Sequence, residues 1–411
     1  MTDYAEARPT IPKSAWIVLA LCILVGVCEG VDLQAAGVAA PRLAPAFGIE
    51  PQALGLFFSS ATFGLMLGAM VGGRISDRIG RKPALIWSVI IFGAMSIATG
   101  LAPNYETLVI ARFLTGVGLG GAMPNLVALV AESVPSSRRS IAVGSLYASM
   151  PLGGAVAALV SMAIGSDPDS WRVIFYIGGF APLVIAPLLF FAMKDTAKAV
   201  PTVDTSGVPE GNRPSVASVL FGEGRSVNTI LLWGAFFLGL LVLYLLLNWL
   251  PTLLVGRGLE RAEASQVQLA FNIAGVVGCV VAGGLMDGKR RAVAALGVFG
   301  LGALSLALLA GAPASLLISI LIGLGLGATM NGAQAVLYGL APSAYPTNMR
   351  GTGIGSAVAF GRLGSAAGPM LAGALVVLGL GAGQIMVVLV PIMLVAGALT
   401  AVLARRVISK D

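Results

Sequence analysis

Two carboxylates stand inside an apolar stretch near the start of the chain. Glu29 and Asp32 are three residues apart, so in a helix their side chains share one face. Ionisable groups at membrane depth are functional by default, because placing a charge there is costly. Burial and mutual repulsion both favour the neutral form of a carboxylate. We therefore expect this pair to take up and release a proton, or alternatively to form a structural ion pair with a neighbouring helix.

Two arginines occupy comparable depths in other apolar stretches. Arg112 lies about 12 Å below the outer end of its stretch, which matches the depth of Asp32. The matching depths therefore allow an ion pair of Arg112 with Asp32 or Glu29. Such a pair would have a structural role, a role in proton coupling, or both. Arg362 falls near the middle of its stretch, where a guanidinium needs an anionic partner. It either reaches Asp32 or Glu29 or binds an anionic substrate, and we favour the substrate.

Polar and aromatic residues are interspersed in the same apolar stretches. Asn331, Gln334 and Tyr338 recur with spacings that place them on one face of a helix. Aromatic surfaces with amide and hydroxyl groups suit a hydroxylated aromatic ligand, although each residue could instead bond a neighbouring helix. The other residues expected at a substrate site are Gln34, Asn125, Tyr147, Tyr244, Asn248, Trp249 and Asn272.

The composition requires membrane-spanning elements to carry these side chains. The chain is 57% hydrophobic and 10% charged, whereas soluble domains carry about 25% charged residues. The net charge of +7 is spread in short clusters between apolar stretches, so we expect no nucleic-acid partner. The chain has no His, and its three Cys lack metal-like spacing, so neither metal nor cofactor is expected. No nucleophile–base pair or phosphate loop indicates an enzyme.

Twelve apolar runs have about the 20 residues that a helix needs to cross a bilayer. They lack the alternation of barrel strands, so we predict an all-α membrane protein. The runs lie near 15–41, 53–73, 84–102, 105–132, 140–165, 172–193, 228–250, 264–286, 292–311, 313–341, 351–378 and 382–404.

The connections between these runs predict orientation and division. Most Lys and Arg residues fall on one side, which places both termini in the cytoplasm of a bacterial inner-membrane protein. The basic residues expected in outer loops are Arg42, Arg172, Arg257 and Arg261. The segment 194–227 is rich in Pro, Gly, Ser and charge, and reads as a linker between six-helix halves at 1–193 and 228–411. Repeated halves of this kind are typical of secondary transporters, whose site lies between them near the midplane.

The segment from Gly73 to Lys82, GRISDRIGRK, resembles the signature G-x-L-A-D-R-x-G-R-K between helices two and three of the major facilitator superfamily. A weaker copy runs from Gly283 to Asp287. An ordinary basic loop would explain the charges but not the glycines, the Asp or the second copy. The resemblance implies that superfamily's fold, twelve helices in two six-helix bundles. It also implies gating roles for Gly73, Asp77, Arg78, Arg81, Glu132, Arg138, Arg139 and Asp287.

Further residues resemble the aromatic acid:proton symporters along essentially the whole chain. They are the acid-Gly-x-Asp box at 29–32, the Arg-x-x-x-Gly-x-Gly pattern from Arg112, the segment NWLP at 248–251 and GRLG at 361–364. Glu29 stands where that family's box usually has Asp, as in its hydroxyphenylpropionate branch. The resemblance implies proton-driven import, by alternating access, of an aromatic carboxylate such as 3-(3-hydroxyphenyl)propionate or a hydroxybenzoate. The expected partners are this substrate, protons and the lipid bilayer, and the expected state is monomeric.

Two alternatives stay open. The first is a proton-driven exporter, because the segment MPLGG at 150–154 partly matches the antiporter motif Gly-Pro-x-x-Gly-Gly. The second is a membrane sensor that does not transport. Sensors of this kind usually add a large soluble domain, whereas the longest soluble stretch here is 194–227.

Overall fold

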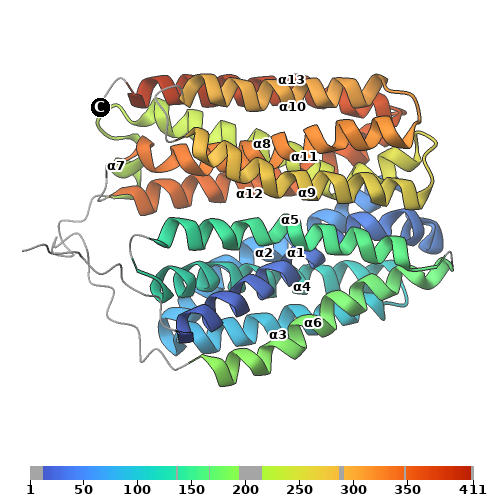
Figure 1. The fold of residues 1–411 in the computed structure, drawn as a ribbon, viewed down its shortest axis with the longest axis horizontal. Coiled ribbons are helices and arrows are strands. Elements are labelled where there is room, and N and C mark those ends of the chain that lie inside the picture. Colours follow the sequence, from blue (N-terminus) through green and yellow to red (C-terminus); the bar gives the residue numbers. More distant parts are fainter. Residues whose placement is uncertain are drawn as a thin grey trace, which may run out of the picture.

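The computed structural model describes residues 13–135, 138–165, 167–193, 215–286, 291–346 and 349–408. Within these residues, twelve helices are long and apolar enough to cross a membrane, which confirms the predicted all-α architecture (Figure 1). The N-terminal half contains α1 (Lys13–Phe47), α2 (Pro51–Ile79), α3 (Arg81–Gly100), α4 (Tyr105–Ser133), α5 (Arg139–Ala163) and α6 (Trp171–Ala192). The C-terminal half contains α7 (Val216–Phe221), α8 (Ser226–Val255), α9 (Arg261–Leu285), α10 (Arg291–Gly311), α11 (Leu316–Leu340), α12 (Arg350–Val377) and α13 (Ala382–Ile408).

Successive long helices run in opposite directions. We call the end of the bundle where α1 begins and α13 ends the terminal side, and the opposite end the distal side (Figure 1). The segment predicted as a linker carries the six-residue helix α7 immediately before α8, while 194–214 lies outside the described residues.

Local sequence signals set several helix boundaries. Asn104 caps α4 by accepting a hydrogen bond from the Thr107 backbone N–H at 2.9 Å. A capping box of Glu260 and Glu263 begins α9. Gly80 separates α2 from α3 with a φ of 94°, a backbone conformation that residues other than glycine rarely adopt. The sharp turn inside the basic signature segment therefore depends on this glycine.

Glycines bring helices within each half into backbone contact. A Cβ at Gly116 of α4 would collide with the Ala61 carbonyl of α2, and one at Gly327 of α11 would collide with the Phe271 carbonyl of α9. Small residues allow this close approach in a membrane, where packing takes the place of the hydrophobic effect between helices. The glycine-rich segments of α4 and α11 therefore allow the same close helix packing in the two halves.

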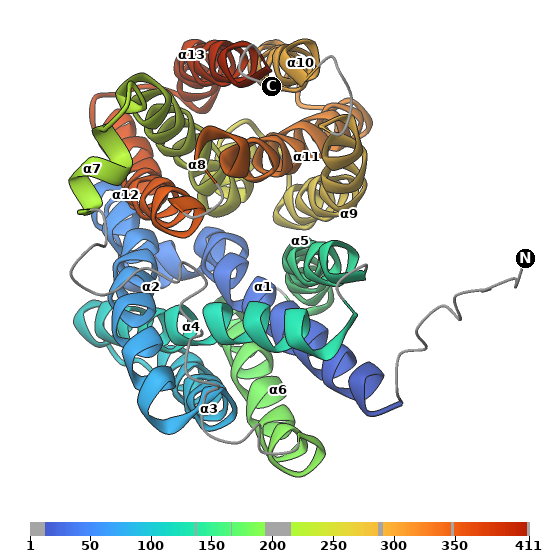
Figure 2. The same ribbon diagram turned by 90° about the vertical axis from the view of Figure 1, so that its left-hand side faces the viewer.

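The halves meet along α1, α2 and α5 on one side and α8, α9 and α12 on the other (Figure 2). Hydrogen bonds join them from the middle of the helices to the distal side. The Ser59 hydroxyl donates to the Ala366 carbonyl at 2.7 Å, and the hydroxyls of Ser161 and Ser265 lie 3.1 Å apart. The distal side is thus closed by direct bonds between the halves.

Candidate functional site

A buried ion pair links α1 to α4. The Arg112 guanidinium donates to the Asp32 carboxylate at 2.8 Å and to the Asp32 backbone carbonyl at 3.2 Å. Both side chains are almost fully buried, and the guanidinium lies 5.6 Å from the centre of the Phe175 ring. The pairing expected from the matching depths of these two residues is present. An ion pair buried in this way holds its helices in a fixed register, because removing either partner leaves an uncompensated charge.

Glu29 has a different environment one turn away on α1. Its side chain is 0% exposed, and neither carboxyl oxygen has a hydrogen-bond partner among the described residues. The charged groups that interact with it electrostatically are Arg362 and Asp32. A buried carboxyl group without donors is held at lowest cost as the neutral acid. The geometry therefore separates the two carboxylates, one paired and one not.

Arg362 enters the same region from α12. Its guanidinium donates to the Tyr244 hydroxyl at 2.6 Å and lies 5.9 Å from the centre of that ring. In the part of the chain that the structure describes, Arg362 forms no ion pair, although it attracts Glu29 at longer range. A half-buried guanidinium held by one phenol keeps donors available for an anion.

Two tyrosines stack across the boundary between the halves. The rings of Tyr147 on α5 and Tyr338 on α11 have centres 5.7 Å apart and planes inclined by 30°. Tyr338 also packs edge-on against Phe236, and both tyrosines lie within electrostatic range of Arg362. Because Tyr147 is near the start of α5 and Tyr338 near the end of α11, their stack lies toward the terminal side.

Gln334 precedes Tyr338 by one turn of α11. Its amide oxygen and nitrogen are both shielded from solvent, and neither has a partner within the described residues. Asn331, expected on the same face, instead donates to the Gly327 carbonyl at 3.0 Å and packs against Gly275. Four of the residues described above interact with Arg362, and Gln334 lies one turn from one of them, Tyr338. We call this set the central cluster and define it as Glu29, Tyr147, Tyr244, Gln334, Tyr338 and Arg362.

Three amides form a hydrogen-bonded clasp between the halves. Gln34 on α1 and Asn272 on α9 each donate to the other at 2.8 Å, and Gln268 donates to the Gln34 oxygen at 2.8 Å. Gly154 leaves the space that the Gln34 side chain fills. Gln34 and Asn272, expected to bind substrate, thus bind one another in this conformation. Sequence reasoning missed Gln268, although its spacing of four from Asn272 places both on one helical face.

Three other residues expected at a substrate site form hydrogen bonds within the protein in this conformation. Asn125 accepts from the Ser76 hydroxyl at 2.5 Å, and it lies about 20 Å along α4 from Arg112. The Asn248 amide donates to the backbone carbonyl of Tyr244 at 2.8 Å. Trp249 is buried, with its indole N–H donating to the Pro369 carbonyl at 3.0 Å. Each of these three side chains thus has a hydrogen-bond partner within the protein in this conformation, and their role as substrate ligands stays a prediction.

The residues expected to gate the protein lie toward the terminal side. Arg81 forms an ion pair with Glu132, which joins the start of α3 to the end of α4 within one half. Gly73 has open space beside it, and Arg78 and Arg138 are exposed. The side chains of Asp77 and Arg139, and all of Asp287, lie outside the described residues. Their gating role therefore stays a prediction.

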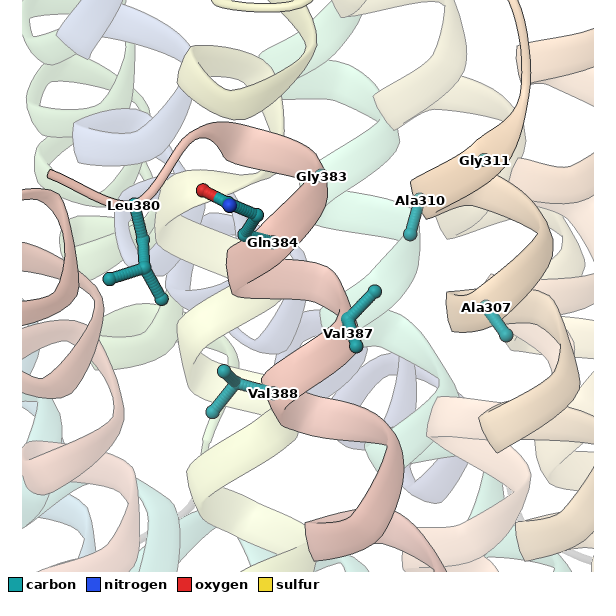
Figure 3. A pocket seen from close by; sticks show the side chains of 8 residues that line it. All are labelled: Ala307, Ala310, Gly311, Leu380, Gly383, Gln384, Val387 and Val388. Atoms are coloured by element: carbon teal, nitrogen blue, oxygen red, sulfur yellow. The ribbon is translucent and has the colours of Figure 1, made fainter.

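A groove between α10 and α13 lies outside the central cluster (Figure 3). Its lining is apolar except for Gln384, whose side-chain oxygen accepts from the Gly381 backbone N–H at 2.8 Å. These helices form the outer edge of the C-terminal half (Figure 2). Nothing in its lining provides charge for chemistry.

Within the described residues, twelve spans in two halves, with charged side chains buried where the halves meet, are the arrangement of a multi-pass membrane transport protein. Comparison with known families agrees. The Major Facilitator Superfamily model matches residues 22–369, and the chain belongs to this superfamily.

Relatives match along nearly the whole chain. The 3-(3-hydroxy-phenyl)propionate transporter of Escherichia coli (strain K12) is 40% identical over 95% of this chain and 94% of its own length. The gallate transporter of Pseudomonas putida is 33% identical over 92% of this chain and 89% of its own. The 4-hydroxybenzoate transporter PcaK of Pseudomonas aeruginosa is 32% identical over 94% and 92%.

Solved structures share the fold at low sequence identity. A structure of the D-xylose-proton symporter matches with a TM-score of 0.75 and 20% identity, covering 92% of this chain and 97% of that one. A bacterial homologue of the human lysosomal transporter Spinster matches with a TM-score of 0.76 and 17% identity, covering 97% and 98%.

Proposed function

We propose that this protein imports an aromatic carboxylate together with a proton across the bacterial inner membrane. The relatives described above carry names of aromatic-acid transporters, and the distribution of Lys and Arg supports a cytoplasmic terminal side. The observation that carries the proposal is Arg362, a guanidinium near the middle of its span that is held by a tyrosine and not by an acid.

Arg362 is proposed to bind the substrate carboxylate. Its planar fork matches a carboxylate geometrically and gives charge-assisted hydrogen bonds. The stacked rings of Tyr147 and Tyr338 lie within electrostatic range of this guanidinium and would offer aromatic faces to the substrate ring. Gln334, one turn from Tyr338 on α11, has an amide without a partner within the described residues, and this amide suits a ring hydroxyl.

Glu29 is proposed to carry the proton, with Asp32 in a supporting role. Asp32 is held by Arg112, so protonating it would leave a buried guanidinium unpaired. Glu29 has no such partner in the described part of the chain and interacts with Arg362 through space. A charged Glu29 competes with the substrate for Arg362, whereas a neutral Glu29 leaves that arginine to the substrate. Proton and carboxylate therefore bind together.

Alternating access requires the boundary between the halves to open on one side at a time. The amide clasp and the Ser161–Ser265 contact close the distal side, which supports assigning this conformation to the cytoplasm-facing part of the cycle. The Tyr147–Tyr338 stack crosses the boundary between the halves toward the terminal side, the side proposed to face the cytoplasm. Separation of these rings is then the step that releases the substrate.

The test is uptake of a labelled panel into proteoliposomes, with and without an inward proton gradient. The panel comprises hydroxyphenylpropionates, hydroxybenzoates and cinnamates, with pyruvate and glucose as controls. We expect gradient-stimulated accumulation of one aromatic acid, and its loss in Arg362→Ala. If no aromatic acid moves, the substrate proposal fails. Accumulation that follows an outward gradient would instead support the exporter.

A further inference from the structure

Arg42 is a buried arginine near the distal end of α1 that the proposed transport mechanism does not use. Its side chain is 7% exposed. One terminal nitrogen of its guanidinium donates to the Ser161 hydroxyl and the other to the Ser161 backbone carbonyl, each at 3.1 Å. The remaining nitrogen, Nε, is buried and has no hydrogen-bond partner among the residues that the structure describes. The guanidinium thus retains a donor that the surrounding protein does not satisfy.

The charge of Arg42 is also uncompensated. No carboxylate forms an ion pair with it among the residues that the structure describes. The charged group that interacts with it is a second cation, Arg261, which begins α9 in the opposite half and is exposed. Burying a charge is costly unless it is paired, and a neighbouring like charge adds to the cost. An anion placed between these two guanidiniums would relieve both penalties.

The two arginines flank the seam that must open on the distal side. Ser161, which Arg42 holds, touches Ser265 of the other half, and the Ser265 hydroxyl donates to the Arg261 backbone carbonyl at 3.1 Å. Separation of α5 from α9 breaks the contact between the two serines and uncovers Arg42. Thirteen residues of α1 separate Arg42 from Glu29, about 20 Å along the helix. This position is therefore distinct from the central cluster.

We propose that Arg42 and Arg261 form an outer docking site for the carboxylate of the transported acid. The inference rests on the proposed function, because it takes the transported species to be an organic anion. The anion entering from the distal side first meets the two guanidiniums, which raise its local concentration at the mouth. It then moves inward to Arg362, and the serine contact re-forms behind it.

The test compares initial uptake rates in proteoliposomes for Arg42→Gln, Arg42→Lys and Arg261→Gln, each normalised to inserted protein. We expect Arg42→Gln and Arg261→Gln to raise KM for external substrate about tenfold, because each removes a charge-assisted contact. The maximal rate should change less than about twofold. The decrease of uptake with ionic strength should flatten in both variants, since screening acts on the removed charge. Arg42→Lys keeps the charge and should stay within about threefold of the unsubstituted KM.

Arg172→Gln is the matched control, because it removes a cation from the same side that is already paired with Asp169. An equal rise of KM in Arg172→Gln would reduce the effect to general surface charge and overturn the docking site. Equal defects in Arg42→Lys and Arg42→Gln would also overturn it, because they would show that Arg42 acts structurally through its hydrogen bonds to Ser161. An unchanged KM in both Gln variants would also overturn it. Should Arg42→Gln fail to insert, exposed Arg261 carries the test alone. If the unsubstituted protein moves no aromatic acid, the proposed function fails instead.

Discussion

Glu29 and Asp32 lie one helical turn apart on α1, yet only Asp32 is paired. Its carboxylate accepts a hydrogen bond from Arg112 at 2.8 Å, while both oxygens of Glu29 are buried without a partner in the described part of the chain. This difference supports the proposal that Asp32 has a structural role and Glu29 carries the proton.

Glu29→Gln should abolish proton-driven accumulation but preserve exchange. The amide mimics the neutral acid, so Arg362 remains available to the substrate while proton release is lost. Uptake by the unsubstituted protein should fall as external pH rises, because fewer carriers hold the proton, and this dependence should flatten in the variant. Counterflow and gradient-driven uptake measured on the same proteoliposomes separate the two activities. A variant that still concentrates substrate would remove Glu29 from the coupling.

Asp32→Asn should destabilise the protein, because it leaves Arg112 buried without its counter-charge. Breaking a buried pair costs about 3–5 kcal/mol. We expect a lower thermal unfolding midpoint in detergent, with much of the loss restored in Asp32→Asn combined with Arg112→Gln. The same measurement on Glu29→Gln is the control and should show a much smaller shift. Equal destabilisation by both single variants would contradict the division of work.

Tyr244→Phe should weaken substrate binding less than Arg362→Lys. The phenylalanine removes one hydrogen bond to Arg362, worth about 0.5–1.5 kcal/mol, or about 2- to 12-fold in Kd. The lysine keeps the charge but loses the planar fork, so we expect a loss of about 10- to 100-fold. Equilibrium binding of the labelled acid to purified protein measures both. A larger loss in Tyr244→Phe would mean that the hydroxyl itself contacts the substrate.

Asn272→Ala should open the distal side. It removes both reciprocal bonds with Gln34, so the closed distal conformation loses stability relative to the open one. Labelling of a single cysteine introduced at Ser265, in a background without Cys22, Cys28 and Cys279, should speed up several-fold. Asn331→Ala is the control, because the side chain of Asn331 bonds within its own helix. Unchanged labelling in Asn272→Ala would show that the clasp does not hold the seam.

Asn125→Ala should leave KM for substrate within about twofold. Its amide bonds Ser76 and the Gly121 carbonyl, far along α4 from the ion pair. The expected effect is a modest loss of thermal stability from the broken hydrogen bonds, about 1–3 kcal/mol. Uptake kinetics and unfolding on the same preparation check both points. A large change in KM would restore Asn125 to the substrate site.

Depth along the membrane could be predicted from the sequence, whereas rotation about each helix axis could not. Counting residues placed Asp32 and Arg112 at the same level, and the structure pairs them. Helical spacing predicted that Asn331 and Gln334 share one face, but their side chains have different surroundings. Asn331 bonds its own helix, and Gln334 has no partner within the described residues. Which face meets the other half depends on packing between segments more than 200 residues apart, as for Gln34 and Asn272.

The backbone contacts at Gly116 and Gly327 have a mechanical consequence. Where two helices touch through their main chains, no side chains lie between them to repack. The relative position of the two helices in each of these pairs is therefore fixed. We therefore expect relative movement to occur mainly at the boundary between the halves, where amides, tyrosines and arginines meet. Substitutions along that boundary are therefore expected to change substrate preference while each half keeps its fold.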